Sequence, residues 1–133
     1  MYKHILIASG GAEHSQRAEE RAVEMSLAVD AKLSLITVLR NDANSDIPKE
    51  SRIRIQESIL KKAAERCQRH GVMPETYMRQ GNAGKRIIET AKELDCDVIV
   101  LGNRQLSLIG VMTEGSVSDY VIRHTHTDVL TVI

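Results

Sequence analysis

Two glycine-containing loops hold the residues of this chain that are best suited to bind a ligand. Gly102 ends an apolar run, and Gly115 and Ser116 begin the helical pattern that follows it. The first turn of a helix leaves backbone N–H groups unpaired, and these groups bind phosphates and other anions. The other loop, Ser9–Ala12, follows the first apolar run of the chain. Ligands of open parallel sheets bind at the carboxyl ends of strands, so these loops predict two neighbouring strands that flank a binding crevice.

Motifs of other nucleotide, catalytic and metal sites do not occur in the sequence. Gly81–Lys85 resembles GxxxxGK[ST] but has a different spacing and no hydroxyl after the lysine, so we interpret it as a strand-to-helix turn. No GxGxxG follows the first apolar run, and no GxSxG elbow accompanies His14 and Ser15. Cys67 and Cys96 lack a CxxC partner, and the histidines are scattered. The sequence therefore predicts no catalytic residues and no metal site.

Composition limits the classes of function that the chain can have. Eighteen basic and eighteen acidic side chains give the 133 residues a formal net charge of zero, which argues against nucleic-acid binding through a basic face. No apolar run is long enough to cross a bilayer, and the N-terminus alternates like a strand and lacks a signal-peptide cleavage site. Aromatic residues make up 2% of the chain, which disfavours flavin binding or base stacking. We expect a cytoplasmic protein with a single domain over residues 1–133.

Strand-like and helix-like segments alternate along the chain. Apolar runs predict strands at residues 2–8, 33–39, 72–80, 98–101 and 128–133. Helical spacing predicts helices at about 15–30, from Pro48 to Gly71, around 87–94 and at about 116–124, with Ser15 as the cap of the first helix and Ile55 on the inner stripe of the second. A helical crossover makes its flanking strands parallel and right-handed. The pattern therefore predicts a three-layer α/β fold with helices on both faces of a parallel sheet.

Two of the predicted strands have features of sheet edges. The third carries Pro74, Glu75 and Arg79, which a central buried strand does not tolerate. The fifth is β-branched, and it is uncharged from Val129 to Ile133. An unprotected edge of this kind usually pairs with another strand, so we predict a homodimer through Val129–Ile133. The alternative is that the fifth strand lies inside the sheet.

The loop residues also carry a resemblance to a known family. Gly102 is followed by two residues and Gln105, then by nine residues and Gly115-Ser116, while the chain opens with KHILIA and continues with SLITV in the second strand. Over essentially its full length the sequence resembles the universal stress protein family. This resemblance implies a five-stranded parallel sheet in the order 3-2-1-4-5 with two helices on each face, similar to adenine nucleotide alpha hydrolases. It also implies that the fifth strand is the edge through which two copies pair.

Two positions depart from the nucleotide-binding members of that family, which carry G-x2-G-x9-G-[ST]. Gln105 replaces the second glycine, and its side chain occupies space where backbone approaches phosphate oxygens, although its amide can donate to a phosphate. Gly10 stands where the family usually has an aspartate that holds the nucleoside. The loss of one charge-assisted hydrogen bond weakens binding about ten- to hundredfold.

The resemblance implies a binding site with adenine near Val38 and the loop after the first strand, and with phosphates near the glycine loop. The implied site residues are Ala8, Ser9, Gly10, Val38, Leu101, Gly102, Arg104, Gln105, Gly115, Ser116 and Val117. Two interpretations stay open. One is a stress-response regulatory module, without enzyme activity of its own, whose cleft has lost part of its binding motif and holds no tight nucleotide. The other is a switch or weak ATPase that still binds ATP or another adenine nucleotide. A flavodoxin-like or receiver domain is disfavoured, because aromatic residues are few and no acidic pair follows the first strand.

Overall fold

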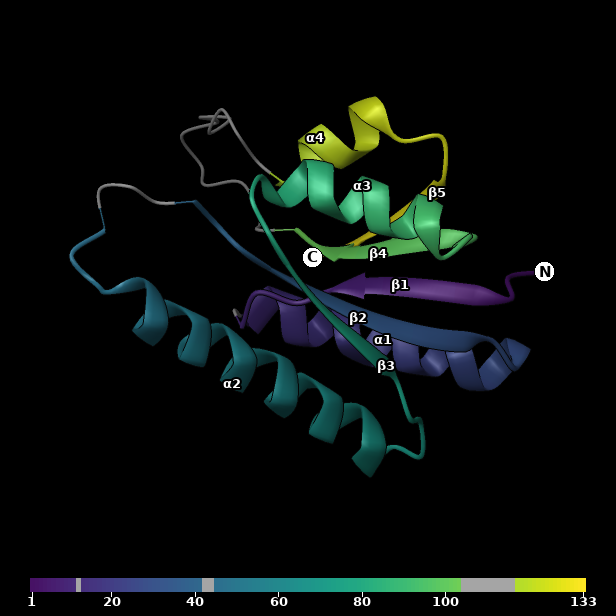
Figure 1. Ribbon diagram of the computed structural model, residues 1–133. Helices are drawn as coiled ribbons and strands as arrows, with labels where there is room; N and C mark the ends of the chain where they lie inside the picture. The colour runs from purple at the N-terminus through teal and green to yellow at the C-terminus, as the bar shows by residue number, and fades with distance from the viewer. Residues whose placement is uncertain (12, 42–44, 104–116) are drawn as a thin grey trace.

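The computed structural model describes residues 1–11, 13–41, 45–103 and 117–133 of the chain. Strands and helices alternate through these residues, as the apolar pattern predicts (Figure 1). Their bounds are β1 His4–Ala8, α1 Glu13–Val29, β2 Lys32–Leu39, α2 Lys49–Arg69, β3 Glu75–Gln80, α3 Ala83–Glu93, β4 Val98–Gly102, α4 Val117–His124 and β5 Asp128–Val132. Gly71 follows α2 with a φ of 86°, which is the left-handed conformation that favours glycine after a helix.

The strands form one parallel sheet in the order β3-β2-β1-β4-β5. The most central strand, β1, pairs Ile5 with Leu33 of β2 on one side and with Val98 of β4 on the other. This register brings the carboxyl ends of β1, β2 and β4 to the same edge of the sheet. The strand order is the predicted one, and it places β3 and β5 at the two edges, so the alternative position of the fifth strand inside the sheet is wrong.

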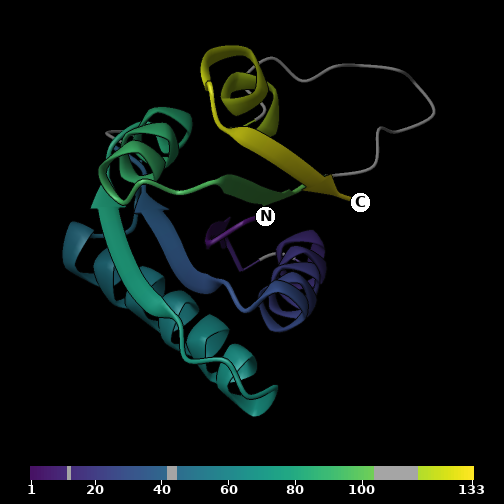
Figure 2. The same ribbon diagram turned by 90° about the vertical axis from the view of Figure 1, so that its right-hand side faces the viewer.

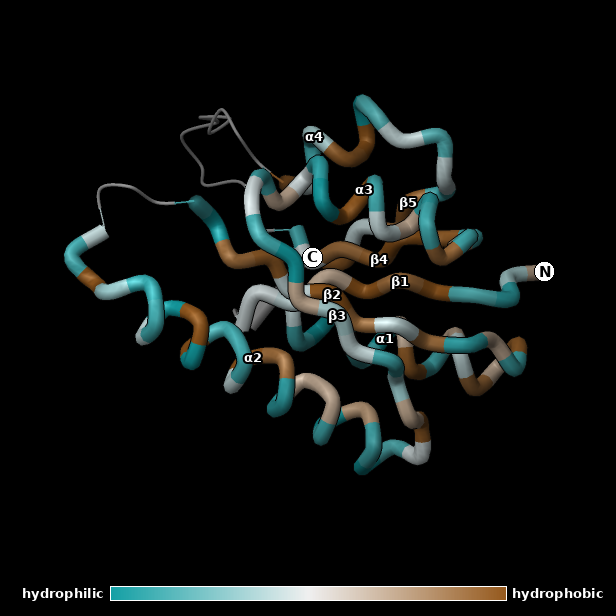
Figure 3. Tube along the Cα trace, in the orientation of Figure 1, coloured by the Kyte–Doolittle hydropathy of each residue, from teal (hydrophilic) through white to brown (hydrophobic). Residues whose placement is uncertain are grey.

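Two helices cover each face of the sheet (Figures 1 and 2). On one face, Ile5 and Ile7 of β1 pack with Ala22 of α1 and Ala63 of α2. On the other face, Leu6 packs with Ile87 of α3 and Val121 of α4. Because successive residues of a strand point to opposite faces, an apolar run such as Ile5-Leu6-Ile7 is buried on both sides. β1 is apolar after His4, and β4 is apolar from Val98 to Leu101 (Figure 3).

Two local predictions are wrong. α1 begins at Glu13, so Ser15 is not its cap; Ser15 lies inside the first turn, where its Oγ accepts a hydrogen bond from the Gly10 N–H at 3.4 Å. Ile55 is 50% exposed, although its spacing with Ile59, Ala63 and Cys67 predicts an inner position. The N-terminal part of α2 extends past the sheet (Figure 1), so only its C-terminal half contributes buried side chains to the core. Within the part of the chain that the structure describes, no helix combines the length and apolar character that a membrane span needs.

Candidate functional site

A cavity of about 470 Å³ lies at the carboxyl ends of the central strands, between α2 on one side and α3 and α4 on the other. Its floor consists of the last residues of β1, β2 and β4, and Ala83 and Val117 at the starts of α3 and α4 belong to its wall. The chain winds from β1 to one side of the sheet and from β4 to the other, so the crossovers diverge at this point and leave a space above the strand ends. The volume falls within the range of small-molecule binding sites, which is about 300–1,000 Å³.

The structure brings seven of the predicted site residues together around this cavity. Ala8, Ser9 and Gly10 follow β1, Val38 lies in β2, and Leu101, Gly102 and Val117 come from β4 and α4. The Ser9 N–H donates to the Ile36 carbonyl at 2.9 Å, which extends the β1–β2 ladder by one residue and fixes this loop at the cavity floor. Arg104, Gln105, Gly115 and Ser116 lie outside the described residues. The role of all eleven in binding stays a prediction.

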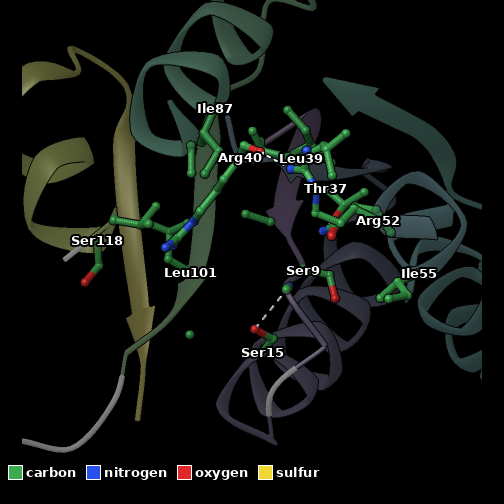
Figure 4. Close-up of a pocket in the computed structure, with 18 of the residues that line it drawn as sticks. Ser9, Ser15, Thr37, Leu39, Arg40, Arg52, Ile55, Ile87, Leu101 and Ser118 are labelled. Atoms are coloured by element: carbon green, nitrogen blue, oxygen red, sulfur yellow. Dashed lines mark hydrogen bonds between the residues drawn. The ribbon is translucent and has the colours of Figure 1, made fainter. Parts of the chain in front are cut away.

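Two arginines that the sequence analysis did not single out face the cavity. Arg40 follows β2, and Arg52 lies on the first turns of α2. Arg52 is held by the backbone of the preceding segment, because its Nε donates to the Ile47 carbonyl at 3.3 Å and its Nη1 to the Arg40 carbonyl at 3.1 Å. Figure 4 shows the Arg40 side chain extending from the end of β2 toward Leu101. Among the described lining residues these are the charged groups, and none of the others is a carboxylate, so the cavity favours an anion.

The remaining wall combines apolar side chains with one hydrogen-bonded amide. Ile47 and Ile55 are 48% and 50% exposed and line the cavity at its α2 side. Beside them, Gln56 Nε2 donates to Thr37 Oγ1 at 2.5 Å, which connects α2 to the end of β2. Apolar surface next to a few fixed polar groups suits a flat ring with polar edges. Arg52 and Gln56 are four residues apart, so they lie on the same face of α2. This spacing is the feature of the sequence that could have indicated a polar face of α2 toward the cavity.

Behind the cavity floor the buried carboxylate of Glu19 forms an ion pair with the half-buried Arg66. Ser9 Oγ donates to Glu19 Oε1 at 2.7 Å. The same carboxylate accepts from Arg66 of α2, with Nε 2.7 Å from Oε2 and Nη2 2.9 Å from Oε1. This pairing raises the pKa of the Arg66 guanidinium. In the sequence, Glu19 directly follows the apolar position Ala18 of α1, and this placement is the feature that could have indicated a buried carboxylate.

The described lining can bind and hold an anion, but it contains no side chain suited to act as a general base. The described residues that line the cavity include no histidine, carboxylate or thiol. Cys67 and Cys96 are buried in the two core clusters, and burial raises the pKa of each thiol to about 11, which keeps both protonated and unreactive at neutral pH. No group of His, Cys, Asp and Glu side chains that could bind a metal occurs in the part of the chain that the structure describes. His124 ends α4, where its Nδ1 lies 2.8 Å from the Tyr120 carbonyl.

Comparisons with known proteins give a consistent set of relatives. The sequence model of the universal stress protein family matches residues 1–132. A putative universal stress protein of Staphylococcus haemolyticus is 31% identical over 98% of this chain and 84% of its own length. A crystal structure of a universal stress protein in complex with cAMP has a TM-score of 0.82 and 28% identity, and it covers 99% of this chain and 97% of that one. A universal stress protein from Archaeoglobus fulgidus in complex with dAMP has a TM-score of 0.80 at 18% identity, with coverage of 99% and 98%, and this second likeness concerns the fold.

Proposed function

The chain belongs to the universal stress protein family, and from this premise we propose that its cavity binds an adenine nucleotide and that the protein acts as a nucleotide-responsive regulatory module. The observation that carries the proposal is the charge of the cavity. Arg40 and Arg52 face it from the β2–α2 side, and no carboxylate belongs to its described lining. A relative that is 28% identical holds cAMP, which is an adenine nucleotide with one negative charge.

The proposed binding mode follows the order of groups along the cavity. The apolar surface of Val38, Ile47 and Ile55 suits the adenine ring, and the loop after β1 lies next to the ribose. The phosphates face Gly102 on one side and the Arg40 guanidinium on the other. Arg40 thus adds a positive charge at the mouth of the site. This charge offsets part of the affinity that is lost because Gln105 stands in place of a glycine.

A second candidate is a regulatory module that works without tight nucleotide. The observation in its favour is Gly10, which leaves the cavity without the carboxylate that the family's nucleotide-binding members use at that position. Under this second proposal the protein acts through contacts with other proteins and the cavity serves no ligand. The two candidates differ in whether the purified protein takes up ATP.

We propose further that two copies of the chain pair through Val129–Ile133. β5 lies at the sheet edge, where Leu130 is 37% exposed. Ile133, which directly follows the strand, is 65% exposed. Two identical edges related by a two-fold axis pair in antiparallel fashion and complete one another's backbone hydrogen bonds. Such a dimer holds two cavities, one in each copy.

Calorimetric titration with ATP, cAMP and adenosine tests the nucleotide proposal. We expect ATP to bind with a Kd below about 100 μM, which corresponds to a binding free energy of about −5.5 kcal/mol. Arg40→Gln should weaken ATP about tenfold and leave adenosine nearly unchanged, because the lost contact is made to phosphate. Arg54→Gln is the matched control, since Arg54 is exposed on the same helix as Arg52 and does not line the cavity. No heat with millimolar ATP would favour the second candidate.

A further inference from the structure

The carboxylate of Glu19 lies directly behind the floor of the proposed nucleotide site. Glu19 is 2% exposed and makes three short hydrogen bonds, one to the Ser9 hydroxyl and two to Arg66. A buried carboxylate requires this number of partners, because an unpaired charge in the core costs several kcal/mol. The pair therefore connects the loop after β1 to α2 through α1.

The Ser9 hydroxyl has a defined direction as a consequence. A hydroxyl has one proton to donate and two lone pairs that accept. The proton of Ser9 Oγ goes to Glu19 Oε1 at 2.7 Å, and the two carboxylate oxygens also accept from the Arg66 guanidinium. Ser9 is 3% exposed and is one of the residues that line the cavity, so the cavity is the side from which a ligand can reach it. Figure 4 shows Ser9 beside Ser15 at the end of β1, and the Ser15 Oγ accepts a hydrogen bond from the Gly10 N–H at 3.4 Å.

We propose that Glu19 is a positioning residue for the ligand, which fixes Ser9 as a hydrogen-bond acceptor for a ribose hydroxyl and makes the site selective for ribonucleotides over their deoxy analogues. The inference rests on the proposed nucleotide binding. Gly10 offers no side-chain acceptor at the cavity floor, whereas Ser9 offers an oxygen whose partial negative charge is reinforced by the carboxylate behind it. The acceptor that position 10 lacks is thus supplied by the neighbouring residue and by a carboxylate on α1.

A purely structural role for the ion pair leads to different behaviour. If Glu19 only joins α1 to α2, its removal destabilises the protein and weakens every nucleotide by the same factor. If it orients and polarises Ser9, its removal reduces the preference for the ribose hydroxyl and leaves the binding of deoxynucleotides little changed. The ratio of the two affinities separates these roles, because a uniform loss of binding cancels in the ratio.

The test is a calorimetric titration of ATP, 2′-deoxy-ATP and 3′-deoxy-ATP into the wild-type protein and its variants. We expect the wild type to bind ATP about three- to tenfold more tightly than at least one deoxy analogue, as for one neutral hydrogen bond. Ser9→Ala should remove this preference. Glu19→Gln should reduce it, because a neutral amide no longer reinforces the partial negative charge on Ser9 Oγ as the carboxylate does. Glu20→Gln, on the exposed neighbour, should keep the wild-type ratio.

Glu19→Gln leaves Arg66 without its anion and so brings a risk of misfolding, which a second variant avoids. Glu19→Gln combined with Arg66→Met removes both charges, and we expect a folded protein with the same reduced ribose preference. Equal affinity of the wild type for ATP and both deoxy analogues, or an unchanged preference in Ser9→Ala, would overturn the inference while the nucleotide proposal stands. Absence of binding for all three nucleotides at millimolar concentration would overturn both.

Discussion

Gly84 determines how closely α3 and α4 approach each other. The residue lies in the first turn of α3 and is buried against the ring of Tyr120 on α4. A Cβ built at this position would lie 2.4 Å from Tyr120 Cδ1, which is closer than real Cβ contacts allow. The preceding turn places the helix here, because Asn82 Oδ1 caps α3 by accepting from the Lys85 N–H at 3.0 Å. At the scale of single residues, the absence of a side chain at Gly84 matters more than its backbone freedom.

We predict that Gly84→Ala lowers the free energy of unfolding by about 1–3 kcal/mol, because the added methyl group displaces the Tyr120 ring and separates the two helices. Urea denaturation measures this change. Lys85→Ala is the control in the same turn, where an exposed side chain should change stability by less than about 0.5 kcal/mol. A Gly84→Ala variant as stable as the wild type would contradict the close approach of α3 and α4.

The two edge strands of the sheet are protected to different degrees. β3 follows Pro74, and Glu75 pairs with Lys32 at 2.8 Å, while the Arg79 guanidinium lies 5.2 Å from the centre of the Tyr77 ring. Charges and a proline keep such an edge from pairing with another chain. In β5 the one charged residue is Asp128, at the start of the strand. Its Oδ2 accepts a hydrogen bond from the Tyr2 hydroxyl at 2.8 Å. At the scale of elements, this asymmetry favours association through β5.

Thr131→Pro tests the proposed pairing of β5. The Val132 carbonyl accepts from the Asn103 N–H at 2.7 Å and so points inward to β4. Since N–H and C=O groups of successive strand residues alternate in direction, the Thr131 N–H points outward, and proline removes it without loss of the β4–β5 ladder. We expect a dimer for the wild type and for Thr131→Val, and a monomer for Thr131→Pro, by sedimentation velocity at micromolar concentration. A monomeric wild type would refute the dimer.

At the scale of the whole molecule, acid stability depends on carboxylates that connect distant parts of the sheet. Asp97 Oδ2, before β4, accepts from the Lys3 N–H at 2.6 Å and from the His4 N–H at 2.7 Å at the start of β1. These two hydrogen bonds hold the pKa of Asp97 below its usual value of 3.8. The pKa of Glu75 is lowered in the same way, mainly by the hydrogen bond from Lys32 and to a smaller extent by the hydrogen bond from Tyr77.

A lowered carboxyl pKa in the folded state gives stability that is present above the usual pKa and is lost as the pH falls through the lowered one. We therefore expect the Tm of the wild type to fall as the pH is lowered from about 5 to about 2.5. Asp97→Asn should have a lower Tm at pH 7 and a shallower fall, because one of the titrating groups is gone. Asp95→Asn, in the same turn, should retain the wild-type slope. An unchanged slope in Asp97→Asn would show that the two hydrogen bonds contribute nothing to acid stability.

The alternation of apolar runs and helical spacing was enough to predict the layers of the fold, and the resemblance supplied the strand order. The loops after β1 and β4 pointed to the end of the sheet where the cavity lies, because their position depends only on where a strand stops. The charged lining was missed, since Arg52 reaches the cavity from α2 and the rotation of a helix about its axis is set by packing. Ile55 illustrates the same limit: its spacing predicts burial, but its part of α2 extends beyond the sheet. The Glu19–Arg66 pair was missed because its partners lie 47 residues apart.

The central position of β1 has a consequence for how the chain folds as it is synthesised. Ile5, Leu6 and Ile7 are completely buried, and the neighbour on one flank, β4, follows about ninety residues later. At translation rates of about 5–20 residues per second, β4 is synthesised roughly 5–20 s after β1. Until β4 is synthesised, β1 can pair with β2 on one side only. Chaperones that bind extended apolar segments therefore have β1 as a target during this interval, and silent changes of codon that slow translation between β2 and β4 should increase aggregation of the unfinished protein.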